Sequence, residues 1–163
     1  SISDIIQNFN PTWDDDSSKD DAFEEAVEFA TIVIKRIISR QVSVIKARDI
    51  VDKGFQNREV NEIMVLEKGS PWLQQLLKID VNSEVLFVIS PGDNNTEYKI
   101  QTVKKTAGTF EARKDLIESI RGKSSDEINS IIKIDDAIFC HKAGFIASAK
   151  SLASALKIAK LSI

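Results

Sequence analysis

The residues best suited to chemistry lie in one stretch near the C-terminus, from His141 to Ser151. The apolar run Ile138-Phe139-Cys140 predicts a strand before it, and the Ala-, Ser- and Lys-rich residues within and after it predict a helix. Backbone N–H groups at a helix N-terminus bind anions, and small residues let a ligand approach closely. The candidate phosphate- or substrate-binding residues are His141, Lys142, Gly144, Phe145, Ser148, Lys150 and Ser151. The alternative is a tight strand-to-helix turn whose small residues serve only packing.

Cys140 and His141 are the single cysteine and the single histidine of the chain. One cysteine excludes an internal disulfide, and one histidine excludes the usual His/Cys metal clusters within one copy. Neighbouring side chains on a strand point to opposite faces, so the two residues do not form a nucleophile–base pair. We expect Cys140 to be buried for structural reasons. For His141 a general base, a phosphate ligand and a structural histidine all stay open. The sequence indicates no catalytic residue and no metal ligand.

Three further groups of residues are candidates for weaker functions. The acidic run Asp14–Asp16 either binds a metal or precedes a helix N-terminus, where the helix dipole favours negative charge. Trp13 and Trp72 either stack on bases or belong to the core. Lys104-Lys105 and Arg113-Lys114 form a second basic cluster, which we expect to be solvated surface.

Composition indicates a soluble, intracellular globular protein. The chain has 163 residues and a mass of 18.2 kDa, with 42% hydrophobic and 29% charged residues. Glycine and proline together number only 9, which excludes collagen-like, low-complexity and wholly disordered classes. The apolar runs, such as residues 30–34, are far shorter than the roughly 20 residues of a membrane span, so we expect no membrane association.

Charge is distributed unevenly along the chain. Residues 1–96 contain 10 basic and 17 acidic groups, a net charge of −7, whereas residues 97–163 contain 12 and 8, a net charge of +4. The last acidic residue is Asp136, and lysines follow it to the end. The pI near 5.3 argues against a general DNA-coating protein. An anion-binding end on an acidic body is one interpretation, and a helix with a solvated lysine face is the other.

The N-terminal third predicts an extended segment followed by a long helix. Pro11 favours an extended conformation for Asn10, so residues 1–16 are expected to be extended. Ser18, with Asp21 three residues later, resembles a capping box. Apolar residues then recur at helical spacing as far as Phe55, which predicts one helix of about 38 residues or two helices with a kink near 39–43. Residues 17–163 are expected to form a single α+β domain.

The remaining residues alternate between strand and helix patterns. Strands are predicted at 63–66, 85–89 and 98–103, the second apolar throughout and therefore central, and the last two joined by a turn at 91–95. Short helices are predicted from Ser70-Pro71, over 116–120 and from Ser124, which has Glu127 three residues later. A strand at 138–140 leads through a Gly144 loop to a final helix opened near Ser148 or Ser151. This order indicates an α+β fold with a mixed sheet and flanking helices.

Three motifs occur in a telling order: Asn10-Pro11-Thr12-Trp13 before the long helix, Lys68-Gly69-Ser70-Pro71-Trp72 before the hairpin, and residues 138–146 near the end. The set resembles the C-terminal half of the melanocyte-proliferating-gene family, also catalogued as metal-dependent protein hydrolases. Members are related to DHH-type phosphoesterases, and some are similar to 3′–5′ RNA exonucleases of mitochondria and nucleus. His141, Gly144, Phe145 and Ile146 match the family's His-Ala-Ser-Gly-Phe-Ile-Gly-Gly run, whereas Ala147-Ser148 replace its paired glycines.

The resemblance implies a longer protein whose N-terminal half holds the two-metal site, with Mn or Mg as cofactor. The chain begins with Ser1 rather than Met, which is consistent with a fragment. It would then be the DHH-associated C-terminal domain, a substrate-binding domain that is not an enzyme alone. Its partners would be its own DHH-like domain and RNA or a nucleotide, and its location mitochondrial, nuclear or otherwise cytoplasmic. The rival hypothesis is a structural or dimerisation domain, a homodimer built on the long N-terminal helix.

Overall fold

A computed structural model of the chain describes residues 1–92 and 94–163. Asp93, which belongs to the predicted turn at 91–95, lies outside the described residues. The described residues form two compact units, Ser1–Ile45 and Lys46–Ile163. Among them, no helix combines the length and the apolar character that crossing a bilayer requires. The expectation of a single domain over residues 17–163 stays a prediction.

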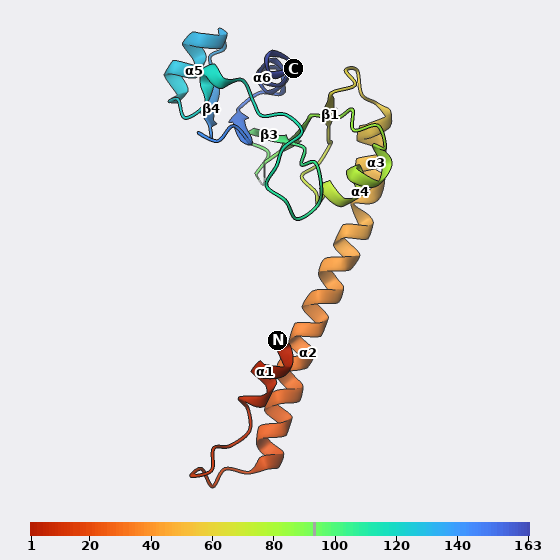
Figure 1. The fold of residues 1–163 in the computed structure, drawn as a ribbon, viewed down its shortest axis with the longest axis vertical. Helices are drawn as coiled ribbons and strands as arrows, with labels where there is room; N and C mark the ends of the chain where they lie inside the picture. Colours follow the sequence, from red (N-terminus) through yellow and green to blue (C-terminus); the bar gives the residue numbers. More distant parts are fainter. Residues whose placement is uncertain (93) are drawn as a thin grey trace. The chain divides into compact units, whose positions relative to one another are not determined.

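The first unit consists of two helices, α1 (Ile2–Gln7) and most of α2 (Lys19–Lys46). Helix α1 corrects the prediction of an extended segment before Pro11. Its first turn is stabilised by a capping box, in which Ser1 and Asp4 each accept a hydrogen bond from the other's backbone nitrogen. In Figure 1, α1 runs alongside the N-terminal half of α2. The ring centroids of Phe9 and Phe29 lie 5.4 Å apart.

The long helical pattern is divided into two helices, as one of the two alternatives predicts. Helix α2 ends at Lys46, and α3 (Arg48–Gln56) follows after Ala47. The break therefore lies several residues beyond the predicted kink at 39–43. Ala47 keeps a right-handed helical backbone and is buried, so the chain departs from helical geometry only locally. The predicted cap at the start of α2 is confirmed, because the Ser18 hydroxyl accepts a hydrogen bond from the Asp21 backbone N–H.

The second unit is built on a five-stranded mixed sheet of order β1-β2-β3-β5-β4. Its strands are β1 (Ile63–Val65), β2 (Phe87–Pro91), β3 (Tyr98–Thr102), β4 (Ala137–Cys140) and β5 (Ile146–Ala149). Strands β1 and β2 are parallel, and the other three pairs are antiparallel. A mixed α/β architecture and the β2–β3 hairpin are thereby confirmed. The middle strand is β3, and β2 lies between it and the edge strand β1.

Each face of the sheet is covered by its own helices. Helices α3 and α4 (Leu73–Ile79) lie on one side in Figure 1, and α5 (Ser125–Ile132) and α6 (Leu152–Ser162) lie on the other. Strand β2 contributes to both cores, because Phe87 and Ile89 pack in the cluster with α5 and α6 whereas Val88 packs with α3 and α4. This confirms that the strand is covered on both faces.

Two local predictions need correction. Helix α4 begins at Leu73 with Trp72 as its N-cap residue and no side-chain cap, so Ser70 and Pro71 precede the helix rather than open it. More important for the site, a strand lies where a loop entering a helix is predicted. Residues 146–149 form β5 between β3 and β4, which excludes a helix start at Ser148. The other predicted start is confirmed, because Ser151 is the N-cap of α6. The small residues of β5 have weak strand propensity, but neighbours on both sides pair with them.

Candidate functional site

The run that the sequence singles out forms the turn of the β4–β5 hairpin, residues 141–145, rather than the entrance to a helix. The His141 N–H donates to the Ile146 carbonyl at 2.9 Å, and the Gly144 N–H donates to the His141 carbonyl at 2.8 Å. Gly144 has a φ of +70°, a left-handed conformation that glycine adopts without steric cost. These bonds close a tight turn that presents His141, Lys142 and Phe145 at one end of the sheet.

Arg121, which sequence analysis missed, lies against this turn. A Cβ atom at Gly144 would stand 2.6 Å from the Arg121 Nε, so the glycine is required for the guanidinium to pack there. The Nε donates to the Leu116 carbonyl at 2.7 Å, and Nη1 lies 4.0 Å from an Asp115 carboxylate oxygen. The only feature of the local sequence that could have indicated a role for Arg121 is its place between the short helix η1 (Glu118–Ile120) and Gly122.

Two aromatic rings lie side by side at the hairpin turn, His141 half-buried and Phe145 exposed. The His141 and Phe145 ring centroids are 4.5 Å apart with a 50° tilt, and 46% of Phe145 is exposed. The Ala143 N–H donates to His141 Nδ1 at 3.1 Å. Since Nδ1 acts as an acceptor, a neutral His141 carries its proton on Nε2. The turn thus combines a stacking surface with the charges of Lys142 and Arg121.

Cys140 takes no part in this surface. It is buried at the end of β4, and burial raises the pKa of its thiol to about 11, with the nearby Arg121 charge acting in the opposite direction. A thiol with this pKa stays protonated near neutral pH and is a poor nucleophile. The structural role predicted for Cys140 is confirmed.

The other predicted binding residues lie at or toward the opposite end of β5. Ser148 is fully buried in the strand, and its hydroxyl has no hydrogen-bond partner among the described residues. Lys150 is exposed, and Ser151 is the N-cap of α6, where its hydroxyl accepts from the Ser154 N–H at 3.2 Å. Four strand residues at roughly 3.3 Å each separate this end from the hairpin turn by about 13 Å. The structure therefore brings together His141, Lys142, Gly144 and Phe145. It places Ser148, Lys150 and Ser151 away from them.

A carboxylate of the chain itself faces the N-terminus of α6. Burial raises the pKa of Asp136, but hydrogen bonds from Ser151 and Ser154 outweigh that effect and hold the pKa below its usual value. The Lys150 N–H also donates to the Asp136 carbonyl at 2.9 Å. An ionised side chain at this position satisfies the helix N-terminus in the way an external anion would.

The weaker candidates separate into distinct roles. Arg113 is 7% exposed and pairs with the buried Asp80, so the predicted solvated cluster at 113–114 is wrong for Arg113. Lys105 pairs with Glu111 on the surface. Trp72 packs on the core with α3 and α4, as the core alternative predicts.

The N-terminal candidates are exposed. Trp13 is almost fully exposed, and Asp14 and Asp15 accept hydrogen bonds from neighbouring hydroxyl groups. In the part of the chain that the structure describes, no group of three or more His, Cys, Asp or Glu side chains is arranged to hold a metal ion. The residues present do not fit the two-metal centre that the family resemblance implies.

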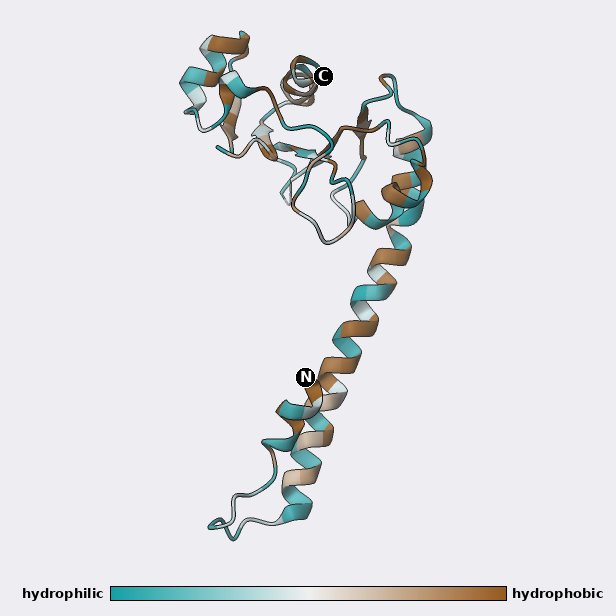
Figure 2. Cartoon of the chain, viewed as in Figure 1, coloured by the Kyte–Doolittle hydropathy of each residue, from teal (hydrophilic) through white to brown (hydrophobic). Residues whose placement is uncertain are grey.

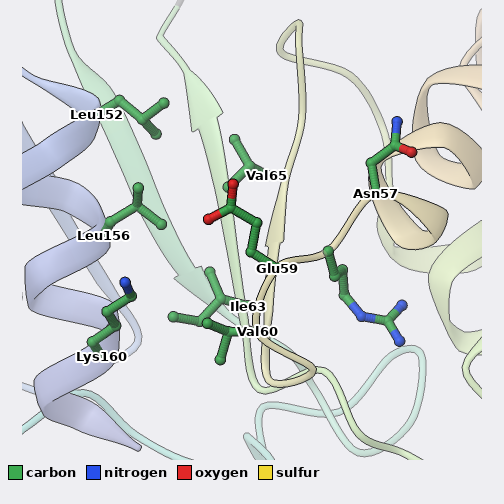
Figure 3. A pocket seen from close by; sticks show the side chains of 9 residues that line it. Asn57, Glu59, Val60, Ile63, Val65, Leu152, Leu156 and Lys160 are labelled. Atoms are coloured by element: carbon green, nitrogen blue, oxygen red, sulfur yellow. The ribbon is translucent and has the colours of Figure 1, made fainter.

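A groove of about 230 Å³ lies between α6 and the edge strand β1, away from the hairpin (Figure 3). Leu152 and Leu156 face Val60, Ile63 and Val65 across it. The charged lining residues are Arg58, Glu59 and Lys160, and the Arg58 guanidinium already donates to the Phe55 carbonyl and to the Glu84 carboxylate. The groove is mainly apolar, and with Arg58 paired to Glu84 its other two charges are of opposite sign, so it offers no strong excess of positive charge for a phosphate.

The similarity to known proteins extends over the whole chain and not only over this turn. The model of the family MYG1_exonuc, described as an uncharacterised protein family (UPF0160), matches residues 1–163. This chain belongs to that family. The resemblance to the melanocyte-proliferating-gene family is thereby confirmed.

Curated members of the MYG1 family match nearly all of the chain. The MYG1 protein of Saccharomyces cerevisiae is 28% identical, covering 100% of this chain and 52% of its own length. The MYG1 exonucleases of Bos taurus and Homo sapiens are 29% and 27% identical, each covering 97% of this chain and 44% and 45% of their own lengths. The chain thus spans about half the length of the curated relatives it matches. No solved structure matches it.

Proposed function

We propose that this chain is the substrate-binding part of a metal-dependent phosphodiesterase, a 3′–5′ RNA exonuclease of DHH type, and that its β4–β5 hairpin binds the RNA. Membership of the MYG1 family supports an exonuclease, because relatives covering 97% of the chain are named MYG1 exonuclease. On this proposal the chain corresponds to a DHH-associated C-terminal domain. It would act in the mitochondrion or nucleus together with a catalytic DHH-like part of the same protein.

The observation that carries the proposal is the grouping of two aromatic rings, half-buried His141 and exposed Phe145, with two cations at one turn. His141 and Phe145 offer a π surface, and stacking of a base on an aromatic side chain contributes about 1–3 kcal/mol. Lys142 is exposed beside them, and Arg121 packs against Gly144 from below. Cations next to a stacking platform are the arrangement that single-stranded nucleic acid binds, with a strong dependence on salt.

The proposal is restricted to the hairpin end of β5. Ser148 has no exposed surface, and Asp136 already supplies a negative charge near Ser151. Because Lys150 lies about 13 Å from the hairpin by strand geometry, it becomes the matched control rather than a ligand. The hydrolytic metals, Mn or Mg, are assigned to the catalytic part, since the residues described here do not fit them.

Charge reversal at the two ends of β5 tests the proposal. Fluorescence anisotropy with a labelled single-stranded RNA oligonucleotide at low salt should show binding to the unaltered chain. Lys142→Glu should weaken that binding at least tenfold, whereas Lys150→Glu, the same change in net charge, should alter it less than twofold. Phe145→Ala should weaken binding at least fivefold, which corresponds to the lower limit of about 1 kcal/mol for stacking.

Each other outcome has a definite meaning. Equal weakening by Lys142→Glu and Lys150→Glu would mean that RNA is attracted by diffuse surface charge. Absence of RNA binding by the unaltered chain at low salt would favour the alternative of a structural domain without a ligand. Tighter binding of a DNA oligonucleotide than of RNA would leave the hairpin site intact but contradict RNA as its substrate.

A further inference from the structure

An extended apolar face of α2 is exposed to solvent. At 3.6 residues per turn, its members share one side of the helix. They are Phe23, Val27, Ile34, Ile37, Ile38, Val42 and Ile45. Their exposed fractions reach 68% for Phe23 and 57% for Ile38. Figure 2 shows the corresponding hydrophobic bands along most of the helix.

Helix α1 covers a different side of α2. Ala26 is buried, and Phe29 is in contact with the Phe9 ring. At 100° per residue, Ala26 and Phe29 lie about 80° and 140° from Ile34 around the helix axis. The exposed face is therefore not the face that organises the first unit. A contiguous apolar surface of this kind marks an interaction site rather than ordinary surface.

The charges of α2 are segregated along its length. Residues 19–28 contain one lysine and five acidic residues, a net charge of −4. Residues 35–46 contain Lys35, Arg36, Arg40 and Lys46 and no acidic residue, a net charge of +4. The two halves of the helix are thus opposite in sign and equal in magnitude. When two copies of α2 lie antiparallel, the acidic half of each helix therefore faces the basic half of the other.

We propose that the exposed face of α2 pairs with the same face of a second copy of this chain, antiparallel and about the helix midpoint between Ile32 and Val33. This pairing places each acidic half beside the basic half of the other copy, whereas a parallel pairing would place like charges together. It brings Val27 level with Ile38 of the second copy. Glu28 lies within two positions of Lys35 of the second copy, on the same flank of the interface. Within one helix, residues 28 and 35 are seven positions apart.

The proposed interface has two-fold symmetry, so every contact occurs twice and the interface closes at two copies. The antiparallel coiled-coil geometry buries the apolar face and leaves the polar side of α2 in water. The inference is independent of RNA binding, because it uses only residues of α2. It turns the general possibility of a homodimer into a specific orientation and register.

Light scattering after gel filtration measures the mass of the full 163-residue chain. We expect twice the 18.2 kDa of one chain. Ile34→Asp should convert the dimer to a monomer, because it introduces two unpaired charges into each pair of helices. The control is Ile32→Asp, on the polar side of α2, which should leave the dimer intact. A monomeric unaltered chain would overturn the proposal, whether another part of the chain or a different protein covers the face.

Cysteine cross-linking tests the orientation. The native Cys140 is buried, so it does not compete. The double variant Val27→Cys/Ile38→Cys should form intermolecular disulfides rapidly under mild oxidation. Neither single variant should cross-link. In the antiparallel pair, identical positions of the two copies are eleven residues apart along the helix axis, which at 1.5 Å per residue is roughly 16 Å. Rapid cross-linking of the single variants would mean a parallel pairing and contradict the proposal.

A charge swap tests the register in the intact chain. Glu28→Lys alone and Lys35→Glu alone should each weaken dimerisation several-fold, because each creates two like-charge contacts across the interface. The double swap Glu28→Lys/Lys35→Glu should restore it. Since residues 28 and 35 are seven apart and do not touch within one helix, restoration requires contact between copies. Additive weakening in the double swap would exclude the proposed register.

Discussion

Gly144 shows how a single residue determines the shape of the hairpin surface. Its φ of +70° and the nearby Arg121 side chain both exclude a larger residue. Gly108 provides a natural comparison, because its φ is +83° but no atom lies within 4 Å of the position its Cβ would take. A replacement would therefore strain the backbone at both positions, whereas its Cβ would meet a neighbour only at Gly144.

We expect Gly144→Ala to lower the free energy of unfolding by about 1–3 kcal/mol more than Gly108→Ala. The left-handed backbone costs each variant roughly 1–2 kcal/mol, and only the first must also displace the Arg121 guanidinium. Urea titration of both variants, followed by far-UV circular dichroism, measures the difference. Equal losses of stability would mean that Arg121 moves away from the turn without cost.

At the scale of an element, β2 links the two cores of the second unit. Phe87 is fully buried and packs with Ile128 and Ile158 from α5 and α6. Its strand neighbours are Ile63 in β1 and Thr102 in β3. A strand held on two edges and two faces has little freedom to close a cavity, so large-to-small changes are expected to be costly.

Phe87→Ala should reduce the free energy of unfolding by about 3–5 kcal/mol, because it leaves a cavity in a close-packed core. Phe110→Ala removes the same atoms from an almost fully exposed position and should change stability by less than about 0.5 kcal/mol. Chemical denaturation of the two variants compares them directly. A loss below about 1 kcal/mol for Phe87→Ala would show that the surrounding side chains refill the space.

At the scale of the whole molecule, two carboxylates, the buried Asp80 and the half-buried Asp136, bind segments outside their own elements. Asp80, at the end of α4, accepts hydrogen bonds from the Val85 N–H at 3.0 Å and from Arg113, 33 residues away. Burial raises the pKa of Asp80, but its bonds with Arg113 and two backbone N–H groups outweigh this and lower the pKa below 3.8. Hydrogen bonds from Ser151 and Ser154, at the start of α6, likewise lower the pKa of Asp136.

These two groups predict acid sensitivity. A carboxyl group whose pKa is lower in the folded state adds stability above its unfolded value, and this stability is lost as the pH falls through the folded value. The free energy of unfolding should therefore be steady near neutral pH and should decline below about pH 4, near the ordinary value of 3.8. Urea titrations between pH 7 and pH 2.5 measure the decline.

Neutral variants identify the groups responsible. Asp136→Asn should remove part of the decline in acid, whereas Glu67→Gln, at an exposed position, should leave it unchanged. Arg113→Met should lower stability at pH 7 by roughly 3–5 kcal/mol, because it leaves Asp80 buried without its charge partner. An acid profile that is the same for Asp136→Asn and the unaltered chain would contradict the assignment.

Local sequence correctly predicts the elements whose caps and apolar spacing are set by residues close together in the chain. Ser124 and Glu127 form the predicted capping box of α5, and the apolar run around Phe87 forms a strand covered on both faces. The helical period after Ser18 correctly predicts α2. In each case the spacing of neighbouring residues is sufficient, because capping and periodic burial depend on residues only a few positions apart.

The features that sequence reasoning missed depend on partners far along the chain. Strand β5 has small residues of weak strand propensity and forms because β3 and β4 pair with it. The family match draws attention to His141, Gly144 and Phe145, which lie in the hairpin turn, but not to Arg121, which contacts the turn from 23 residues before Gly144.

By itself, the sequence determined the family, the mixed α/β class and the main helices, and it singled out residues 141–151 as a candidate region. Only the tertiary structure decided that Lys142 and Lys150 lie at opposite ends of β5 and that Asp136 faces the N-terminus of α6. The physical reason is that side chains converge through strand pairing and packing between distant segments. The spacing of residues along the chain does not encode those contacts, so a run of candidate residues became two separate surfaces.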